Sequence, residues 1–251
     1  MKTKNTYLLY FLVYKNLQLK YKHSLLGFVW SFLHPLLYLL IFNFVFSKAF
    51  SNIENYPLFV LSGLIFWIYF SASANQLCQT FIRNSHLIKS LNVKKMFYAL
   101  SEQGAELFNF LIGLLAFAIL MFFLGMKITW NLFYIFPIII LFTFFTFCFG
   151  VILGSLNVFF RDIGILWNTL NPALFYLTPI AYSIEIVPKK FMFFFKLNPL
   201  YHFYYIMRNV LYQGQPPEIR YTLYCLAICA ITFVLALFIY RKTRNGFISN
   251  L

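Results

Sequence analysis

Long apolar runs divide the chain, and polar residues fall mostly in the gaps between them. A membrane-spanning helix needs about 20 consecutive, mostly apolar residues. Runs of this kind predict six spans, at about residues 25–46, 57–77, 100–124, 132–159, 165–184 and 221–240. We therefore predict an all-α integral membrane protein in which a single transmembrane domain covers residues 1–251.

Two further segments contain apolar residues without the length or purity of a span. In residues 1–23, the apolar positions that could share one helix face predict an amphipathic helix at the membrane interface, with no cleavable signal peptide; they are Tyr7, Leu8, Phe11, Leu12 and Tyr14. Residues 189–212 include cations and the helix-breaking pair Asn198-Pro199. Such groups are costly in hydrocarbon, so this segment predicts short re-entrant or interfacial helices packed in protein.

Composition agrees with a membrane protein. Hydrophobic residues make up 62% of the chain and charged residues only 10%, whereas a soluble domain carries about a quarter charged residues. The net charge of +14 indicates lipid headgroups rather than nucleic acid, because the basic residues flank the apolar runs. Placing the N-terminus inside puts 13 Lys and Arg residues in cytoplasmic segments and 7 outside. The positive-inside rule therefore predicts that both termini are cytoplasmic.

The residues needed for several enzyme chemistries are missing from the sequence. There is one Asp, so no Asp-x-Asp metal motif, and there is no Gly-rich phosphate-binding loop. We therefore predict a transport protein without its own nucleotide site, driven by an ion gradient or by a partner chain. Glu102 and Glu106 share one helix face, and pairing with Arg83, Lys94 or Lys95 is preferred over a proton relay. The four cysteines lie in apolar runs and predict lipid-facing or packing residues rather than a disulfide or metal site.

Five ordered segments carry a family resemblance: LKYKHSLLGFVWSFLHPLL (19–37), LSGLIFWIYF (61–70), LGSLNVFFRDIG (153–164), LTPIAYS (177–183) and KLNPLYHF (196–203). The set resembles the permease subunits of bacterial ABC-2 type polysaccharide exporters, which carry lipid-linked O-antigen, capsule or teichoic-acid chains. The resemblance implies an inner-membrane protein that works with a second copy of itself and two ABC ATP-binding subunits. ATP and Mg would be used by those subunits, with no cofactor bound by this chain. The alternatives are an ABC-2 permease for a drug or small lipid, or a non-ABC membrane carrier or glycosyltransferase.

The resemblance also implies roles for particular residues. The internal loop 83–95 would form a short helix that docks on the ATPase, although a loop lying on lipid headgroups is the alternative; its candidates are Arg83, His86, Leu87, Ile88, Lys89 and Leu91. A basic strip would meet the pyrophosphate of a polyprenyl-linked substrate, or only anchor the chain to lipid: Lys20, Lys22 and His23. Asn198, Pro199 and Tyr201 would belong to an external gate, and Arg161 and Asp162 would form a structural pair at the cytoplasmic face.

Aromatic residues suggest a path for the glycan, because flat apolar rings stack on sugar rings. Phe66, Tyr69 and Phe70 fall on one face of the second predicted span, while Trp67 points away from that face. We predict that the three line a central channel between two copies, with Tyr182 opposite them. The alternative is an aromatic belt at the outer membrane interface.

Overall fold

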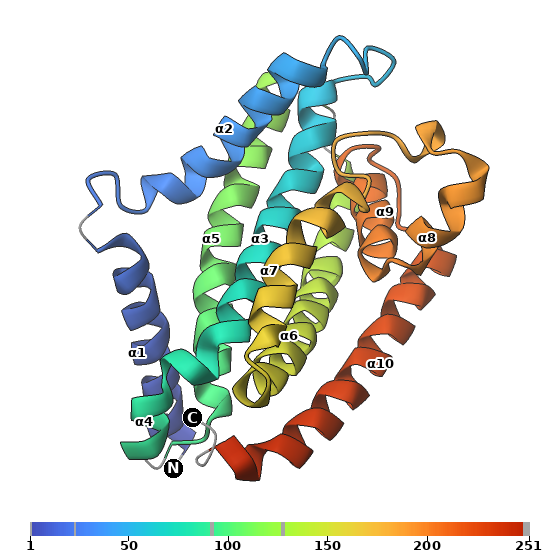
Figure 1. Ribbon diagram of the computed structural model, residues 1–251. Helices are drawn as coiled ribbons and strands as arrows, with labels where there is room; N and C mark the ends of the chain where they lie inside the picture. The colour runs from blue at the N-terminus through green and yellow to red at the C-terminus, as the bar shows by residue number, and fades with distance from the viewer. Residues whose placement is uncertain (1, 23, 91–92, 127–128, 248–251) are drawn as a thin grey trace.

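The computed structural model describes residues 2–22, 24–90, 93–126 and 129–247, and it is helical throughout these ranges without a strand (Figure 1). The α-helices are α1 Lys2–Tyr21, α2 Val29–Phe46, α3 Tyr56–Arg83, α4 Ser85–Ser90, α5 Met96–Phe123, α6 Ile135–Phe159, α7 Asp162–Tyr176, α8 Met192–Leu197, α9 Pro199–Leu211 and α10 Ile219–Thr243. Short 3-10 turns are η1 Trp130–Tyr134, η2 Ile184–Ile186, η3 Lys189–Phe191 and η4 Arg244–Gly246.

Five helical segments among the described residues are long and apolar enough to cross a membrane: α2, α3, α5, the continuous η1–α6 unit and α10. They agree with five of the six predicted spans. The remaining predicted span, 165–184, was wrong in extent, because α7 has 15 residues and is about 22 Å long. A hydrocarbon core is about 30 Å thick. The helix ends at Tyr176 because Pro179 lacks an N–H and disfavours helical geometry at the residue before it.

The centre of the protein is the contact between α3 and α6. Most of α3 is buried, and α5 and α6 flank it (Figure 1). Gly150 and Gly154 of α6 form a notch for Leu77 of α3: a Cβ at Gly150 would overlap the Leu77 side chain, and one at Gly154 would overlap the Leu77 carbonyl oxygen. Small residues four apart are a common way for membrane helices to bring their backbones together. All four cysteines are free and buried, in agreement with the packing role predicted for them.

Helix α1 lies lengthwise against the first turns of α5. Val13 contacts Gly104, and Asn16 donates from Nδ2 to Ser101 Oγ at 3.1 Å. Further along both helices, Tyr21 donates to Asn109 Oδ1, so the two helices run parallel. The predicted apolar face of α1 is therefore divided: Leu12 is buried against protein, whereas Tyr7, Phe11 and Tyr14 are exposed. This corrects the expectation that all of them face the membrane interface.

One end of the molecule collects the basic segments. Helix α1 begins there, α10 ends there, and α4 and the turn between α6 and α7 lie beside them (Figure 1). Arg83, Lys89, Arg161 and Arg241 are all exposed in these segments. This grouping agrees with the charge count, which placed all four of these residues on the same side of the membrane.

Candidate functional site

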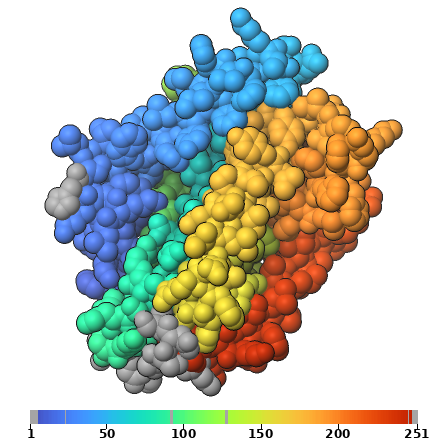
Figure 2. Space-filling model, viewed as in Figure 1, coloured from blue at the N-terminus to red at the C-terminus, as the bar shows by residue number. Residues whose placement is uncertain are grey.

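A groove of about 520 Å³ lies between α2, α3 and α7. Figure 2 shows α7 as a ridge at the surface, with α2 beside it. The groove lining combines amides and hydroxyls with aromatic rings; its members include His34, Tyr38, Trp67, Ser71, Asn75, Asn171, Phe175 and Tyr176. Among the described residues, no Lys, Arg, Asp or Glu side chain lines this groove. The groove therefore presents a few hydrogen-bonding groups in a largely apolar and aromatic lining, without a strong charge.

Hydrogen bonds fix the amides of the groove. Trp167 Nε1 donates to Asn75 Oδ1 at 2.6 Å, and Asn171 Nδ2 donates to Ser71 Oγ at 2.6 Å. The Asn171 Oδ1 atom is buried without a hydrogen-bond partner in the described part of the chain. A buried acceptor without a partner is costly, so this oxygen marks a strained point in the wall of the groove.

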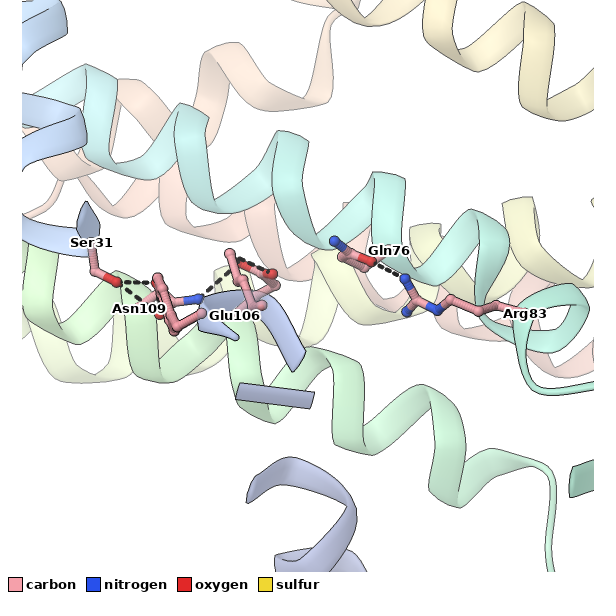
Figure 3. Close-up of polar contacts among 7 residues, drawn as sticks. Ser31, Gln76, Arg83, Glu106 and Asn109 are labelled. Atoms are coloured by element: carbon pink, nitrogen blue, oxygen red, sulfur yellow. Dashed lines mark hydrogen bonds and ion pairs between the residues drawn. The ribbon is translucent and has the colours of Figure 1, made fainter. Parts of the chain in front are cut away.

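A second cavity, of about 330 Å³, lies where α1 ends and α2 begins, against α3 and α5; we call it the α1–α2 chamber. Lys20 Nζ lies 2.9 and 2.8 Å from the two carboxylate oxygens of Glu106. Asn109 lies between Glu106 and Ser31 (Figure 3), and its Oδ1 accepts hydrogen bonds from Tyr21 at 2.8 Å and from Ser31 at 3.0 Å. The chamber and the groove share three lining residues, His34, Ile68 and Ala72, so the two cavities adjoin.

The two carboxylates of α5 are both buried and both paired. Glu102 accepts from Arg83, whose other guanidinium nitrogen donates to Gln76 Oε1 at 2.6 Å (Figure 3). Pairing with nearby cations is what the sequence favoured, and Arg83 was one of the partners considered. The partner of Glu106 is Lys20, which the sequence analysis did not consider because it lies 86 positions away.

The predicted substrate-headgroup strip is only partly available. The Lys20 charge is neutralised by Glu106, so a free lysine facing the headgroups was the wrong expectation for this residue. Lys22 is exposed, and His23 lies outside the described residues. The sequence identifies the cation but cannot show which acid reaches it.

The structure corrects the position of the predicted channel face. The exposed fractions of Phe66, Tyr69 and Phe70 are 0%, 2% and 1%, because this face of α3 packs in the protomer core against α5 and α6. The rings of Phe110 and Phe142 occupy the space in front of Phe66. No surface that a second copy could reach is left there.

Other aromatic side chains line the groove instead. Trp67, which was expected to point away from the channel face, lies in the groove against Phe175, with a ring-centroid distance of 5.3 Å. Tyr182 is partly buried after the end of α7, and its hydroxyl donates to the Tyr176 carbonyl oxygen.

The short helix predicted after Arg83 exists as α4, but its apolar residues face inward. Ile88 is buried and Leu87 half-buried, in a cluster that includes Leu12 and Phe81. Arg83, His86 and Lys89 are the exposed candidates, and Leu91 lies outside the described residues. The predicted docking face formed by Leu87 and Ile88 is therefore not on the surface, and the exposed face of α4 is polar.

The segment LGSLNVFFRDIG forms a junction of three helices. Asn157 is buried and joins α6 to α3 and α7: its Nδ2 donates to the Cys78 carbonyl at 2.9 Å, and its Oδ1 accepts from the Gly164 N–H at 3.1 Å. Arg161 and Asp162 are both exposed, and the described structure has no ion pair between them. Asp162 lies in the first turn of α7, where a negative charge is favoured by the helix dipole. Asn157 was missed by sequence reasoning, although a lone amide in an apolar run is a signal.

The segment 177–181, between α7 and η2, is held by side chains from two other helices. Asn198 is the N-cap of α9, followed by Pro199 at the first helical position, and Tyr201 is buried in that helix. Asn198 Nδ2 donates to the Leu177 carbonyl at 3.1 Å and to Thr178 Oγ1 at 2.9 Å. Arg208 donates to the carbonyls of Pro179 and Ile180.

Tyr56, at the start of α3, completes this set of contacts. Its hydroxyl donates to the Ala181 carbonyl at 3.0 Å. A polar group on each residue from 177 to 181 is thus bound by a side chain from outside the segment. Sequence reasoning treated Arg208 only as a cation on the outer side and did not find this contact.

Comparison with known proteins gives the class. The family model described as ABC-2 type transporter matches residues 7–212, so the chain belongs to the ABC-2 type transporter family. It is similar to the O-antigen export system permease protein RfbA of Klebsiella pneumoniae, at 32% identity over 80% of this chain and 78% of that protein. The protein of the same name from Myxococcus xanthus is 27% identical over 96% and 94% of the two chains. The polysialic acid transport protein KpsM of Escherichia coli is 23% identical over 90% and 89%.

Proposed function

We propose that this chain is the permease subunit of an ATP-driven exporter of a lipid-linked, O-antigen-like cell-surface polysaccharide. Membership of the ABC-2 type transporter family and the names of the relatives support this. The structural observation that carries it is the groove between α2, α3 and α7, with its amides, hydroxyls and aromatic rings. Sugar hydroxyls exchange readily between such hydrogen-bonding groups, and sugar rings pack on aromatic faces without being held at one point.

The exporter would contain a second copy of this chain and two ABC ATP-binding subunits, in the bacterial inner membrane with both termini cytoplasmic. Exposed polar residues on α7, Asn168 and Thr169, favour a protein partner there over lipid. A second copy covering α2 and α7 would close the groove into a channel. ATP and Mg would be bound by the partner ATPase, which would contact the polar face of α4 through His86 and Lys89.

The same groove favours a glycan over the alternative of a drug or small lipid. Sugar rings are held by aromatic faces together with hydrogen-bonding groups, and this groove combines Trp67 and Phe175 with Ser71, Asn75 and Asn171. A single transport event for a long chain requires many weak contacts, and neutral amides provide these more readily than charges do.

Export from a strain lacking the chain tests the proposal. Complementation with the wild-type gene should restore polysaccharide at the cell surface, and Trp67→Leu together with Asn171→Ala should reduce it by about tenfold or more. The matched control is Phe238→Leu, since Phe238 is 63% exposed on α10, outside the groove. Normal export by the double variant, at equal protein level, would exclude the groove as the path.

A further inference from the structure

The α1–α2 chamber has a depth in the membrane that can be estimated from α5. That helix has 28 residues, about 42 Å, and so exceeds a hydrocarbon core of about 30 Å. Glu106 is ten residues beyond Met96, which is about 15 Å along the axis. With the hydrocarbon core centred on α5, about 6 Å of the helix projects at each end, so Glu106 lies about 9 Å inside the hydrocarbon on the side where α5 begins.

The polar side of the chamber carries no net charge. Lys20 contributes one positive charge and Glu106 one negative charge, and the two are in direct contact at 2.8 Å. The Glu106 side chain is only 5% exposed. A phosphate would have to displace this carboxylate or lie against it, and like charges at this distance repel strongly. A neutral ligand meets no such penalty.

The hydrogen-bonding groups suit a ligand that both donates and accepts. Asn109 Oδ1 already accepts from Tyr21 and Ser31, and Asn109 Nδ2 lies 3.3 Å from a Glu106 oxygen. Lys20 has three N–H donors, of which two reach the carboxylate, and the carboxylate has further lone pairs. Vicinal hydroxyl groups can match such a mixture, because each hydroxyl can donate and accept.

An aromatic ring completes the set. Trp30, in the first turn of α2, lines the chamber and is 43% exposed. The cavity of about 330 Å³ is at the small end of ligand sites, so it has room for one ring and not for a chain. The groove that adjoins it is the path in the proposed function.

We propose that the α1–α2 chamber is a binding site for one neutral sugar ring of a membrane-anchored glycan, held by Glu106, Asn109 and the Trp30 face. The inference rests on the proposed function for the origin of the ligand, but the site follows from the neutral ion pair, the amide and the ring. The Lys20–Glu106 pair orients hydrogen bonds here and is not a phosphate receptor.

Binding can be measured without export. The full-length chain, with any ATP-binding subunit that co-purifies, is placed in lipid nanodiscs and titrated with a short-chain alkyl glucoside and an alkyl phosphate of equal chain length. We expect saturable binding of the glucoside, weakened at least about fivefold by Trp30→Leu, and weaker binding of the phosphate. Trp130→Leu is the matched control, since Trp130 is 86% exposed and lies outside the chamber.

A neutral double variant separates the two ligand chemistries. Lys20→Gln with Glu106→Gln keeps the chamber uncharged but replaces the carboxylate that holds the ring, so glucoside affinity should fall at least about threefold while alkyl phosphate binding stays weak. Preferential binding of the alkyl phosphate by the wild-type chain, unchanged glucoside binding by the double variant, or equal glucoside binding by Trp30→Leu and wild type would each overturn the proposal.

The failure of this proposal can be distinguished from failure of the proposed function. If glucoside binding is absent while the wild-type chain restores export in cells, only the chamber assignment falls. If glucoside binds as expected while the wild-type chain restores no polysaccharide at the cell surface, the site stands and the exporter assignment falls.

Discussion

The guanidinium carbon of Arg208 lies 3.8 Å from the centroid of the Phe59 ring, so a cation of α9 rests on an aromatic face of α3. The same guanidinium donates to the carbonyls of Pro179 and Ile180. Burial lowers the pKa of Arg208 to about 10, which still leaves it charged at neutral pH. Three parts of the outer region are therefore joined by one side chain that has no anionic partner among the described residues.

Replacing Arg208 with Lys should weaken this junction. Lys keeps the charge but not the planar fork that reaches two carbonyls at once. We expect a loss of about 1–3 kcal/mol, measured as a lower midpoint of thermal unfolding in detergent, together with reduced export. Arg220→Lys is the control, since Arg220 is exposed. An unchanged midpoint for Arg208→Lys would show that the carbonyl contacts contribute little.

The α4 helix allows a separation of folding from partner binding. Ile88→Asp should place a carboxylate in the internal cluster and lower the free energy of unfolding by about 2–5 kcal/mol. The amount of folded protein should therefore fall with or without the ATPase present. His86→Glu with Lys89→Glu should leave the amount of folded protein unchanged and reduce co-purification of the ATPase. Fluorescence-detected size exclusion measures the first effect and pull-down the second. Normal co-purification with the charge-reversed pair would place the docking surface elsewhere.

The Arg83–Glu102 pair should show rescue. Arg83→Ala leaves the buried Glu102 carboxylate without its cation, and we expect a cost of about 1–3 kcal/mol, reduced because the Arg83 side chain is 48% exposed. Adding Glu102→Gln removes the unpaired charge and should recover most of the loss. Thermal unfolding of the single and double variants measures the coupling. A double variant no more stable than Arg83→Ala would contradict this explanation.

Two glycines at helix contacts, Gly154 of α6 and Gly113 of α5, should respond differently to replacement by Ala. Gly154→Ala directs a methyl group at a backbone carbonyl that cannot move away, and it should destabilise the protein by about 1–3 kcal/mol. Gly113→Ala meets the Ile65 side chain at 3.3 Å, which can shift, so its effect should be smaller. Equal unfolding midpoints for the two variants would argue against a rigid contact between α3 and α6.

Hydropathy was sufficient to locate most of the helices, because each helix that crosses a membrane must by itself be long and almost entirely apolar. It failed at α7, where Pro179 ends the helix early and hydrogen bonds from other helices replace helical ones. The hydropathy of residues 177–184 did not reveal that the helix ends at Tyr176, because this segment is apolar enough to extend a span.

The site was harder to predict than the fold, because helical periodicity identifies a face but not its neighbour. Phe66 and Tyr69 share a face, as expected, but that face meets Phe110 and Phe142. Trp67 lies in the groove because α3 is covered by α5 and α6 on the opposite side. The Lys20–Glu106 contact was equally hidden, since it depends on α1 running along α5.

The notch that Gly150 and Gly154 form around Leu77 also limits where the protein can change shape. Backbones in direct contact can neither approach further nor slide without losing their fit, so α3 and α6 must move as one rigid body. Helices α2 and α10 bury little of their surface in the protomer, so they can shift at a lower cost. We therefore expect any widening of the path during transport to occur by displacement of α2 from a stationary α3–α6 pair, to which α7 is tied by hydrogen bonds.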